Sequence, residues 1–271
     1  MHGLAVQEWG DPTEPGILLW PGLGATSGYF RSVAQALPGR AVAVDPPGFG
    51  RSAPPPLYTY QRLIEAAARV VEACDCRAMV GHSLGAALAV GVAGKPPAGL
   101  RAAVLIDGGF LDAEAMAELG MPTTAGRAEL IGWLEMNAPR FPDWETAIRE
   151  LAPMFGAAPT RALGVYVREL LSDVNGEIRD LTPPDRMADL LLAVLHQDVT
   201  ALAARVKVPA LLIACGQPAE HRSIREKAWR AFASASPLVE LHVADDWGHN
   251  PILQDPEASS SLIAGWLARH L

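Results

Sequence analysis

Short apolar runs bounded by glycine, proline or charged residues recur along the chain, and they constrain its fold most strongly. They are GILLW at 16–20, RAVAVD at 40–45, AMVG at 78–81, AAVLID at 102–107, PALLIAC at 209–215 and LVELHV at 238–243. Runs that are apolar at successive rather than alternate positions are typical of strands buried on both faces. Helical patterns lie between most of them, and alternating strands and helices favour a mostly parallel sheet covered on both sides. The sequence therefore predicts an α/β fold with a doubly wound sheet.

The helical patterns have recognisable limits. Residues 61–73 carry one pattern with a single apolar face, and residues 84–94 carry another. SIRE at 223–226 has the spacing of a capping box. DPE at 255–257 places Asp at an N-cap and Pro at the first helical position. We expect helices to begin at these two signals.

The alternation of strands and helices stops between residues 111 and 185. Helical patterns follow one another there without a strand between them, and prolines separate them. We expect a helical insertion in one loop of the sheet. The predicted division is a core of residues 1–110 and 186–271 and a helical cap of residues 111–185.

Composition excludes several classes of protein. The chain has 271 residues, 50% of them hydrophobic, a net charge of −8 and a pI near 5.4. This length is enough to bury a large core, and the acidic balance argues against a nucleic-acid partner. The most apolar stretch, residues 78–94, contains a His and a Ser and is shorter than the roughly 20 residues of a membrane span. We expect no membrane insertion.

The cysteines and the first residues of the chain favour a cytoplasmic protein. Cys74, Cys76 and Cys215 are odd in number and lack the spacing of a disulfide framework or a zinc site. The first residues lack the cationic segment and apolar segment of a secretory signal. No phosphate loop or cluster of metal ligands stands out in the sequence. We expect no metal and no cofactor, and the oligomeric state is not predicted.

GHSLG at 81–85 is a G-x-S-x-G motif, which places a serine on a strained turn between a strand and a helix. Glycine is needed at both flanking positions because larger side chains would clash across so tight a turn. The motif alone is weak, since Gly and Ser are common in turns. Here AMV reads as the strand before it and AALAVGVAG as the helix after it. We predict that Ser83 is a nucleophile above the carboxyl end of the sheet, where open α/β folds bind their ligands.

With these features in order, the chain resembles the α/β-hydrolase superfamily over nearly its whole length. LLWPGLG at 18–24 is similar to the family's oxyanion-hole loop, and DPPGFGRS at 45–52 resembles its glycine-rich turn. WGHNP at 247–251 is similar to the loop that holds the catalytic histidine, and the helical insertion lies where the family carries its cap. The resemblance implies a serine hydrolase.

A serine attacking a carbonyl requires N–H donors for the developing oxyanion. One donor is the backbone N–H of the residue after the nucleophile, Leu84, at a helix N-terminus. By its match to the family, Leu23 is the second. The serine also needs a base, and His249 follows the last predicted strand in a loop able to reach Ser83. We interpret His82 as a packing residue or a pocket wall.

The histidine needs an acid, and two carboxylates compete for that role. The family's commonest position follows the penultimate strand, but Ala219 stands there and Glu220 is one residue later. Some α/β-hydrolases carry the acid after the sixth strand of their sheet, which Asp107 matches at the end of AAVLID. Asp107 could also simply cap its turn. We predict Asp107 as the acid, with Glu220 as the alternative. Weaker candidates are Asp45, Asp245 and Asp246.

The insertion supplies aromatic side chains that could line an apolar substrate pocket, although helical spacing also suits a core. The candidates are Trp133, Trp144, Phe155 and Tyr166. We predict a small-molecule substrate, a small to medium and fairly apolar carboxylic ester, thioester or lactone, cleaved through an acyl-enzyme. The same triad could instead serve C–C bond hydrolysis, lyase or cyclase chemistry, or perhydrolysis. A non-catalytic ligand-binding protein with this fold is the remaining alternative.

Overall fold

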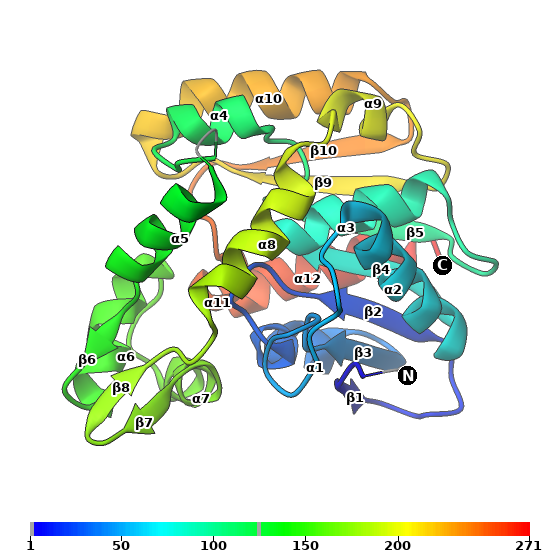
Figure 1. The fold of residues 1–271 in the computed structure, drawn as a ribbon. Coiled ribbons are helices and arrows are strands. Elements are labelled where there is room, and N and C mark those ends of the chain that lie inside the picture. The colour runs from blue at the N-terminus through cyan, green and yellow to red at the C-terminus, as the bar shows by residue number, and fades with distance from the viewer. Residues whose placement is uncertain (1–2, 124–125) are drawn as a thin grey trace.

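The computed structural model describes residues 3–123 and 126–271, and a seven-stranded sheet lies at its centre (Figure 1). The strand order is β1-β3-β2-β4-β5-β9-β10. The edge strand β1 pairs antiparallel with β3, and the other neighbours are parallel. The strands are β1 (Val6–Trp9), β2 (Gly16–Trp20), β3 (Arg40–Val44), β4 (Cys76–His82), β5 (Ala102–Ile106), β9 (Ala210–Cys215) and β10 (Val239–Ala244). The predicted α/β fold with a mostly parallel sheet is confirmed.

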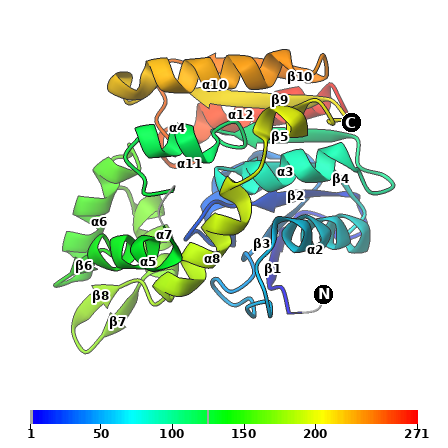
Figure 2. The ribbon, with the colours of Figure 1, turned by 45° about the horizontal axis from the view of Figure 1, so that its top comes forward.

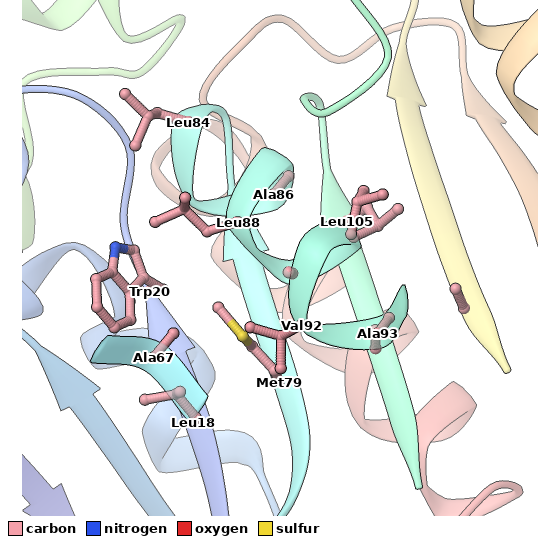
Figure 3. Close-up of a cluster of buried hydrophobic side chains, with 14 of the residues drawn as sticks. Leu18, Trp20, Ala67, Met79, Leu84, Ala86, Leu88, Val92, Ala93 and Leu105 are labelled. Carbon is pink, nitrogen blue, oxygen red and sulfur yellow. The ribbon is translucent and has the colours of Figure 1, made fainter. Parts of the chain in front are cut away.

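Successive strand residues bury their side chains on opposite faces of the sheet, which is why the runs do not alternate with polar residues. Leu18 packs with Met79 and Leu88 in the core on one face, as Figure 3 shows. Leu19 belongs to the core on the other face. The first face is covered by α2 (Tyr60–Ala73), α3 (Leu84–Gly94), α9 (Val199–Ala203) and α10 (Arg222–Ser234). The second is covered by η1 (Ser27–Phe30), α1 (Arg31–Ala36), α11 (Pro251–Gln254) and α12 (Pro256–Ala268).

Helix limits agree with the sequence signals in part. Asp255 caps α12 by accepting the backbone N–H of Ala258 at 3.0 Å, as its position predicts. The capping box at 223–226 does not form. Helix α10 already begins at Arg222, and the side chain of its N-cap residue His221 accepts no hydrogen bond from the helix.

The insertion stands at one end of the sheet in both views (Figures 1 and 2). Its helices are α4 (Ala113–Glu118), α5 (Arg127–Met136), α6 (Trp144–Met154), α7 (Arg161–Leu170) and α8 (Pro184–Leu195). It also contains a three-stranded antiparallel sheet, which the helical interpretation missed. The strands are β6 (Arg140–Phe141), β7 (Ser172–Val174) and β8 (Glu177–Arg179).

These strands are too short to leave an apolar run in the sequence. The turn between β7 and β8 did leave a signal, because Asn175-Gly176 is a typical hairpin pair and both residues have positive φ. The predicted cap boundary at residue 185 falls inside α8. Since α8 packs on α5 through Leu130, Leu134 and Leu191, we propose that the insertion extends to the end of α8.

No helix within the two described ranges is long and apolar enough to cross a lipid bilayer.

Candidate active site

Ser83 lies on the turn between β4 and α3, in a backbone conformation that side-chain-bearing residues rarely adopt. Its φ is +55° and its ψ is −118°, a combination that costs free energy unless the surroundings hold it. The Ser83 N–H donates to the carbonyl oxygen of Ile106 at 2.9 Å, and the Ser83 carbonyl accepts the Ala86 N–H at 3.0 Å. The turn is therefore tied both to the neighbouring strand and to the helix that follows.

Glycines surround this turn because other chain segments approach it closely. A Cβ on Gly81 would lie 2.2 Å from the carbonyl oxygen of Gly85, and one on Gly85 would lie 2.1 Å from that of Trp20. A Cβ on Gly108 would lie 2.2 Å from the carbonyl oxygen of Ser83. Real Cβ atoms do not make such contacts, so the motif glycines and Gly108 together allow β2, β4 and β5 to converge beneath Ser83.

His249 connects Ser83 with Asp107. In the loop after β10, its Nε2 lies 3.1 Å from the Ser83 Oγ and its Nδ1 lies 2.7 Å from the Asp107 Oδ2. The His249 side chain is 50% exposed, whereas that of Asp107 is 1% exposed. The structure thus brings together the three residues that the sequence singled out, in the chain order Ser, Asp, His.

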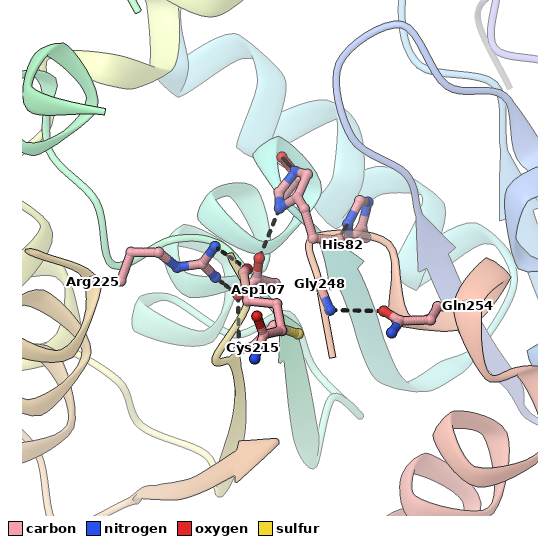
Figure 4. A network of polar contacts seen from close by, with 9 residues as sticks. His82, Asp107, Cys215, Arg225, Gly248 and Gln254 are labelled. Carbon is pink, nitrogen blue, oxygen red and sulfur yellow. Dashed lines mark hydrogen bonds and ion pairs between the residues drawn. The ribbon is translucent and has the colours of Figure 1, made fainter. Parts of the chain in front are cut away.

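The loop that carries His249 is held from two sides. The Gly248 N–H donates to the Gln254 Oε1 at 2.7 Å (Figure 4), and the Gln254 Nε2 donates to the Asp246 carbonyl at 3.0 Å. On the other side, the His82 Nε2 donates to the carbonyl oxygen of His249 at 2.6 Å. These bonds fix the backbone of the loop and leave the imidazole of His249 free to contact its two partners.

His82 is buried and stacks on the ring of Tyr29 at 4.6 Å between centroids. Burial, followed by the neighbouring charge of His249, lowers the pKa of His82 to about 3. His82 is therefore neutral near pH 7, and a neutral imidazole with its proton on Nε2 is the form that donates to the His249 carbonyl. The sequence interpretation of His82 as a packing residue omitted this bond.

Asp107 follows β5 and receives donors from three directions. Its Oδ1 accepts the backbone N–H of Cys215 at 3.0 Å and a hydrogen bond from the Arg225 guanidinium. Its Oδ2 contacts the His249 Nδ1. Figure 4 shows Arg225 and Cys215 converging on the carboxylate.

These partners determine the charge of Asp107. Burial alone would raise the pKa of this carboxyl. The hydrogen bond and charge of His249, the charge of Arg225 and the Cys215 N–H outweigh burial and lower the pKa to about 2. Asp107 is therefore ionised across the neutral range, as a partner for an imidazolium must be.

The contribution of Arg225 was not predicted from the sequence. Its side chain, from α10, is only 7% exposed and also donates to the Gln217 carbonyl at 3.3 Å. A signal was present, because Arg225 shares the buried stripe of α10 with Trp229 and Phe232 at helical spacing. A charged residue on an apolar stripe indicates a buried partner.

The other carboxylates lie elsewhere. Glu220 is exposed in the short helix η2 (Ala219–His221), while the His249 Nδ1 is bonded to Asp107. Asp45 accepts the backbone N–H groups of Ser27 and Arg51, so it braces its glycine-rich turn. Asp245 is exposed and pairs with Arg222. Asp246 is also exposed.

A cavity of about 480 Å³ opens above Ser83 between the sheet and the insertion, and apolar side chains line most of it. Phe155 and Tyr166 lie in its wall, as expected. Trp133 and Trp144 do not. Trp133 packs in the apolar cluster between α5 and α8, and Trp144 packs at the base of α6 with the Arg168 guanidinium 4.5 Å from its ring. The packing of the insertion, rather than helical spacing, keeps these two rings out of the cavity wall.

Leu23 and Leu84 both border the cavity beside Ser83. Leu84 is the first residue of α3, so its N–H has no acceptor within the helix. Within the described ranges, the backbone N–H of neither Leu23 nor Leu84 donates to another backbone carbonyl. This is the environment expected of two backbone N–H groups that are available to bind an oxyanion.

Comparisons with known proteins place this geometry in a family. A model of the alpha/beta hydrolase family matches residues 17–260. A 3-hydroxybutyrate-oligomer hydrolase from Cupriavidus necator is 34% identical, over 94% of this chain and 90% of that protein.

Solved structures agree in fold. The E-2-(acetamidomethylene)succinate hydrolase superimposes with a TM-score of 0.77 at 22% identity, over 98% of this chain and 95% of the other. The enol-lactonase from Burkholderia xenovorans LB400 gives a TM-score of 0.67 at 18% identity, over 98% and 96%. At these identities the similarity concerns the fold alone. Together with the sequence matches, it establishes that this chain belongs to the alpha/beta hydrolase family.

Proposed function

We propose that the protein hydrolyses carboxylic esters through an acyl-enzyme on Ser83. The observation that carries the proposal is the continuous contact from the Ser83 Oγ to the His249 Nε2 at 3.1 Å and from the His249 Nδ1 to the Asp107 Oδ2 at 2.7 Å. A neutral serine is a poor nucleophile near pH 7, and a histidine oriented by a carboxylate overcomes this.

In the first half of the reaction, the Ser83 Oγ attacks the ester carbonyl while the His249 Nε2 takes its proton. The carbonyl oxygen becomes an oxyanion, which the N–H groups of Leu23 and Leu84 stabilise; each such donor contributes about 3–4 kcal/mol. Collapse of the tetrahedral intermediate breaks the bond to the alcohol, and His249 returns the proton to the departing oxygen. Ser83 is left acylated.

In the second half, His249 takes a proton from a water molecule, whose oxygen attacks the acyl carbonyl. The same donors stabilise the second oxyanion, the acid departs, and the proton returns to the Ser83 Oγ. Asp107 keeps the Nδ1 of His249 protonated and stabilises the imidazolium in both halves. Its low pKa keeps it charged throughout.

The cavity supports a small to medium acyl or alcohol group of largely apolar character. Its volume of about 480 Å³ and its apolar lining suit a compact organic ligand better than a polymer chain. The relative from Cupriavidus necator is named a hydrolase of 3-hydroxybutyrate oligomers, which are esters of a short hydroxy acid. We propose short-chain carboxylic esters as the substrate class, with thioesters and lactones as the alternative acyl donors.

A fluorophosphonate probe tests the nucleophile, and an ester panel tests the reaction. We expect the probe to label the native protein but not Ser83→Ala. We also expect p-nitrophenyl esters of acetate to octanoate to be hydrolysed by the native protein only. A protein that binds these esters but is neither labelled nor active would be a ligand-binding member of the family and would contradict the proposal.

A further inference from the structure

Asp180 places a second carboxylate in the wall of the cavity, and the proposed reaction does not use it. The residue follows β8 in the insertion and lines the cavity together with Tyr166, Leu170 and Leu171. Most other lining side chains are aliphatic or aromatic. A carboxylate in such surroundings needs donors, because moving it out of water is costly.

The protein supplies Asp180 with hydrogen-bond donors but, among the described residues, with no counter-charge. Its Oδ1 accepts the Thr182 N–H at 2.8 Å, and the Leu181 N–H also lies close to the carboxylate. Among the described residues no Arg, Lys or His forms an ion pair with it, and its sequence neighbour Arg179 is directed to Glu177 instead. Burial raises the pKa of Asp180 despite these two N–H donors and a hydrogen bond from the Thr182 side chain. An ionised carboxylate can accept about four hydrogen bonds, so it retains capacity for a donor in the cavity.

Aromatic rings link the Ser83 turn to Asp180 along the cavity wall. Tyr29 stacks on His82, which directly precedes Ser83, and the Tyr166 ring lies 5.8 Å from the Tyr29 ring. Burial raises the pKa of Tyr166, and the negative charges of Glu169 and Asp180 raise it further, so Asp180 is near Tyr166. The aromatic wall therefore runs from Ser83 toward Asp180, and a ligand touching both would extend along it.

We propose that Asp180 binds a hydroxyl group at the end of the substrate remote from the scissile ester bond. This inference rests on the proposed esterase function and identifies esters that carry such a hydroxyl as the preferred substrates. A hydroxyl suits the site better than an ammonium group does. An ammonium group would have to move from water into an apolar cavity in which Asp180 is its one charged partner. Its desolvation would cost more free energy than that of a hydroxyl group. The carboxylate would equally disfavour substrates with a negatively charged end.

The test compares matched esters on the full-length protein. The substrates are p-nitrophenyl hexanoate, its 6-hydroxy analogue and its 6-amino analogue. The variants are Asp180→Leu, Asp180→Asn and, as a control, Glu118→Gln, which changes an exposed carboxylate of the same insertion.

For the native protein and the control, we expect kcat/KM for the hydroxy ester to exceed that for the plain ester about 10- to 100-fold, chiefly through KM. In Asp180→Leu the hydroxy ester should lose this advantage while the plain ester is hydrolysed at least as well. Asp180→Asn should lie between, because its amide still accepts a hydrogen bond without the charge. A merely structural role would lower kcat/KM for both esters equally, and that result would overturn the inference, as would a preference for the amino ester.

Binding measurements keep this test separate from the proposed function. Hexanamide and 6-hydroxyhexanamide carry no good leaving group, so their affinities can be measured by calorimetry in Ser83→Ala protein. We expect the hydroxyamide to bind about tenfold more tightly, and Asp180→Leu to remove the difference. If the native protein is inactive but the affinities for the two amides still differ, the esterase proposal alone is contradicted. If hexanamide and 6-hydroxyhexanamide bind with equal affinity, the proposed role of Asp180 alone is contradicted.

Discussion

Replacing Arg225 by methionine tests how Asp107 is held. The change keeps the length and the apolar stem of the side chain but removes its charge. Arg225 and Asp107 are 7% and 1% exposed, so water cannot replace the lost partner. Removing one member of such a buried pair costs about 3–5 kcal/mol of unfolding free energy. We expect the unfolding free energy of Arg225→Met, measured by chemical denaturation at pH 7, to be lower than that of the native protein by this amount.

The pH dependence of stability gives a second measure. The pKa of Asp107 is lowered from 3.8 to about 2. A depressed pKa contributes stability that is present above the unfolded-state value and is lost as pH falls through the folded-state value. The shift corresponds to about 2 kcal/mol. The native protein should lose this amount between about pH 5 and pH 2, and Arg225→Met should lose less because its Asp107 starts from a higher pKa.

The same substitution should change catalysis in a way that a packing defect would not. The Arg225 guanidinium donates to the Oδ1 of Asp107, whereas His249 contacts the Oδ2 of the same carboxylate. Without the guanidinium, the pKa of Asp107 rises, because one of the groups that lower it is gone. Protonation of Asp107 deprives His249 of its charged partner, so the loss of kcat/KM on acidification should set in at higher pH in Arg225→Met than in the native protein.

The matched control is Arg230→Met on the same helix. Arg230 is exposed and pairs with Glu226 at the surface, where an ion pair contributes about 0–1 kcal/mol. If both variants lose the same small free energy and show the same pH profile, then Arg225 does not hold the Asp107 carboxylate.

Two further predictions concern the acid and the turn. Asp107→Asn should lower kcat about 10³–10⁴-fold in steady-state assays, because His249 would lose its tautomer and its counter-charge, whereas Glu220→Gln should leave kcat unchanged; the reverse order would show that the acid is misassigned. Gly108→Ala should both destabilise the fold and abolish labelling of the serine, because its Cβ would lie 2.2 Å from a backbone oxygen. Its control, Gly132→Ala in α5, meets open space and should raise the unfolding free energy by about 0.5–1 kcal/mol. Equal melting temperatures for the two alanine variants would contradict the steric argument.

The sequence predicted most reliably those features that a few neighbouring residues determine. The strand over 102–107 and the helix over 84–94 follow from continuous local patterns, and both are found within a residue or two. The turn at Ser83 was predictable for the same reason, since its glycines are required by contacts within a few ångströms of the motif.

Features that depend on distant packing were harder to predict. The local pattern around Arg225 indicates a capping box, and it does not identify Asp107 as the partner of an ion pair because the two residues lie 118 positions apart in the chain. Trp133 and Trp144 have the same helical spacing as Phe155 and Tyr166, and only the packing of the insertion decides which rings face the cavity. The sheet of β6, β7 and β8 is held by pairing between strands of two or three residues, which local composition does not record.

The pairing of β4 with β5 also has a consequence for how activity returns after denaturation. His82 and Ile106 are partners in the ladder, so the residues that follow them, Ser83 and Asp107, are set side by side by two adjacent strands. His249 instead depends on the last strand, β10, at the edge of the sheet. Refolding chains in which the centre of the sheet has formed would therefore not hydrolyse an ester until β10 pairs with the sheet. We expect enzymatic recovery to lag behind the far-ultraviolet circular dichroism signal, making hydrolysis a readout of the final assembly step.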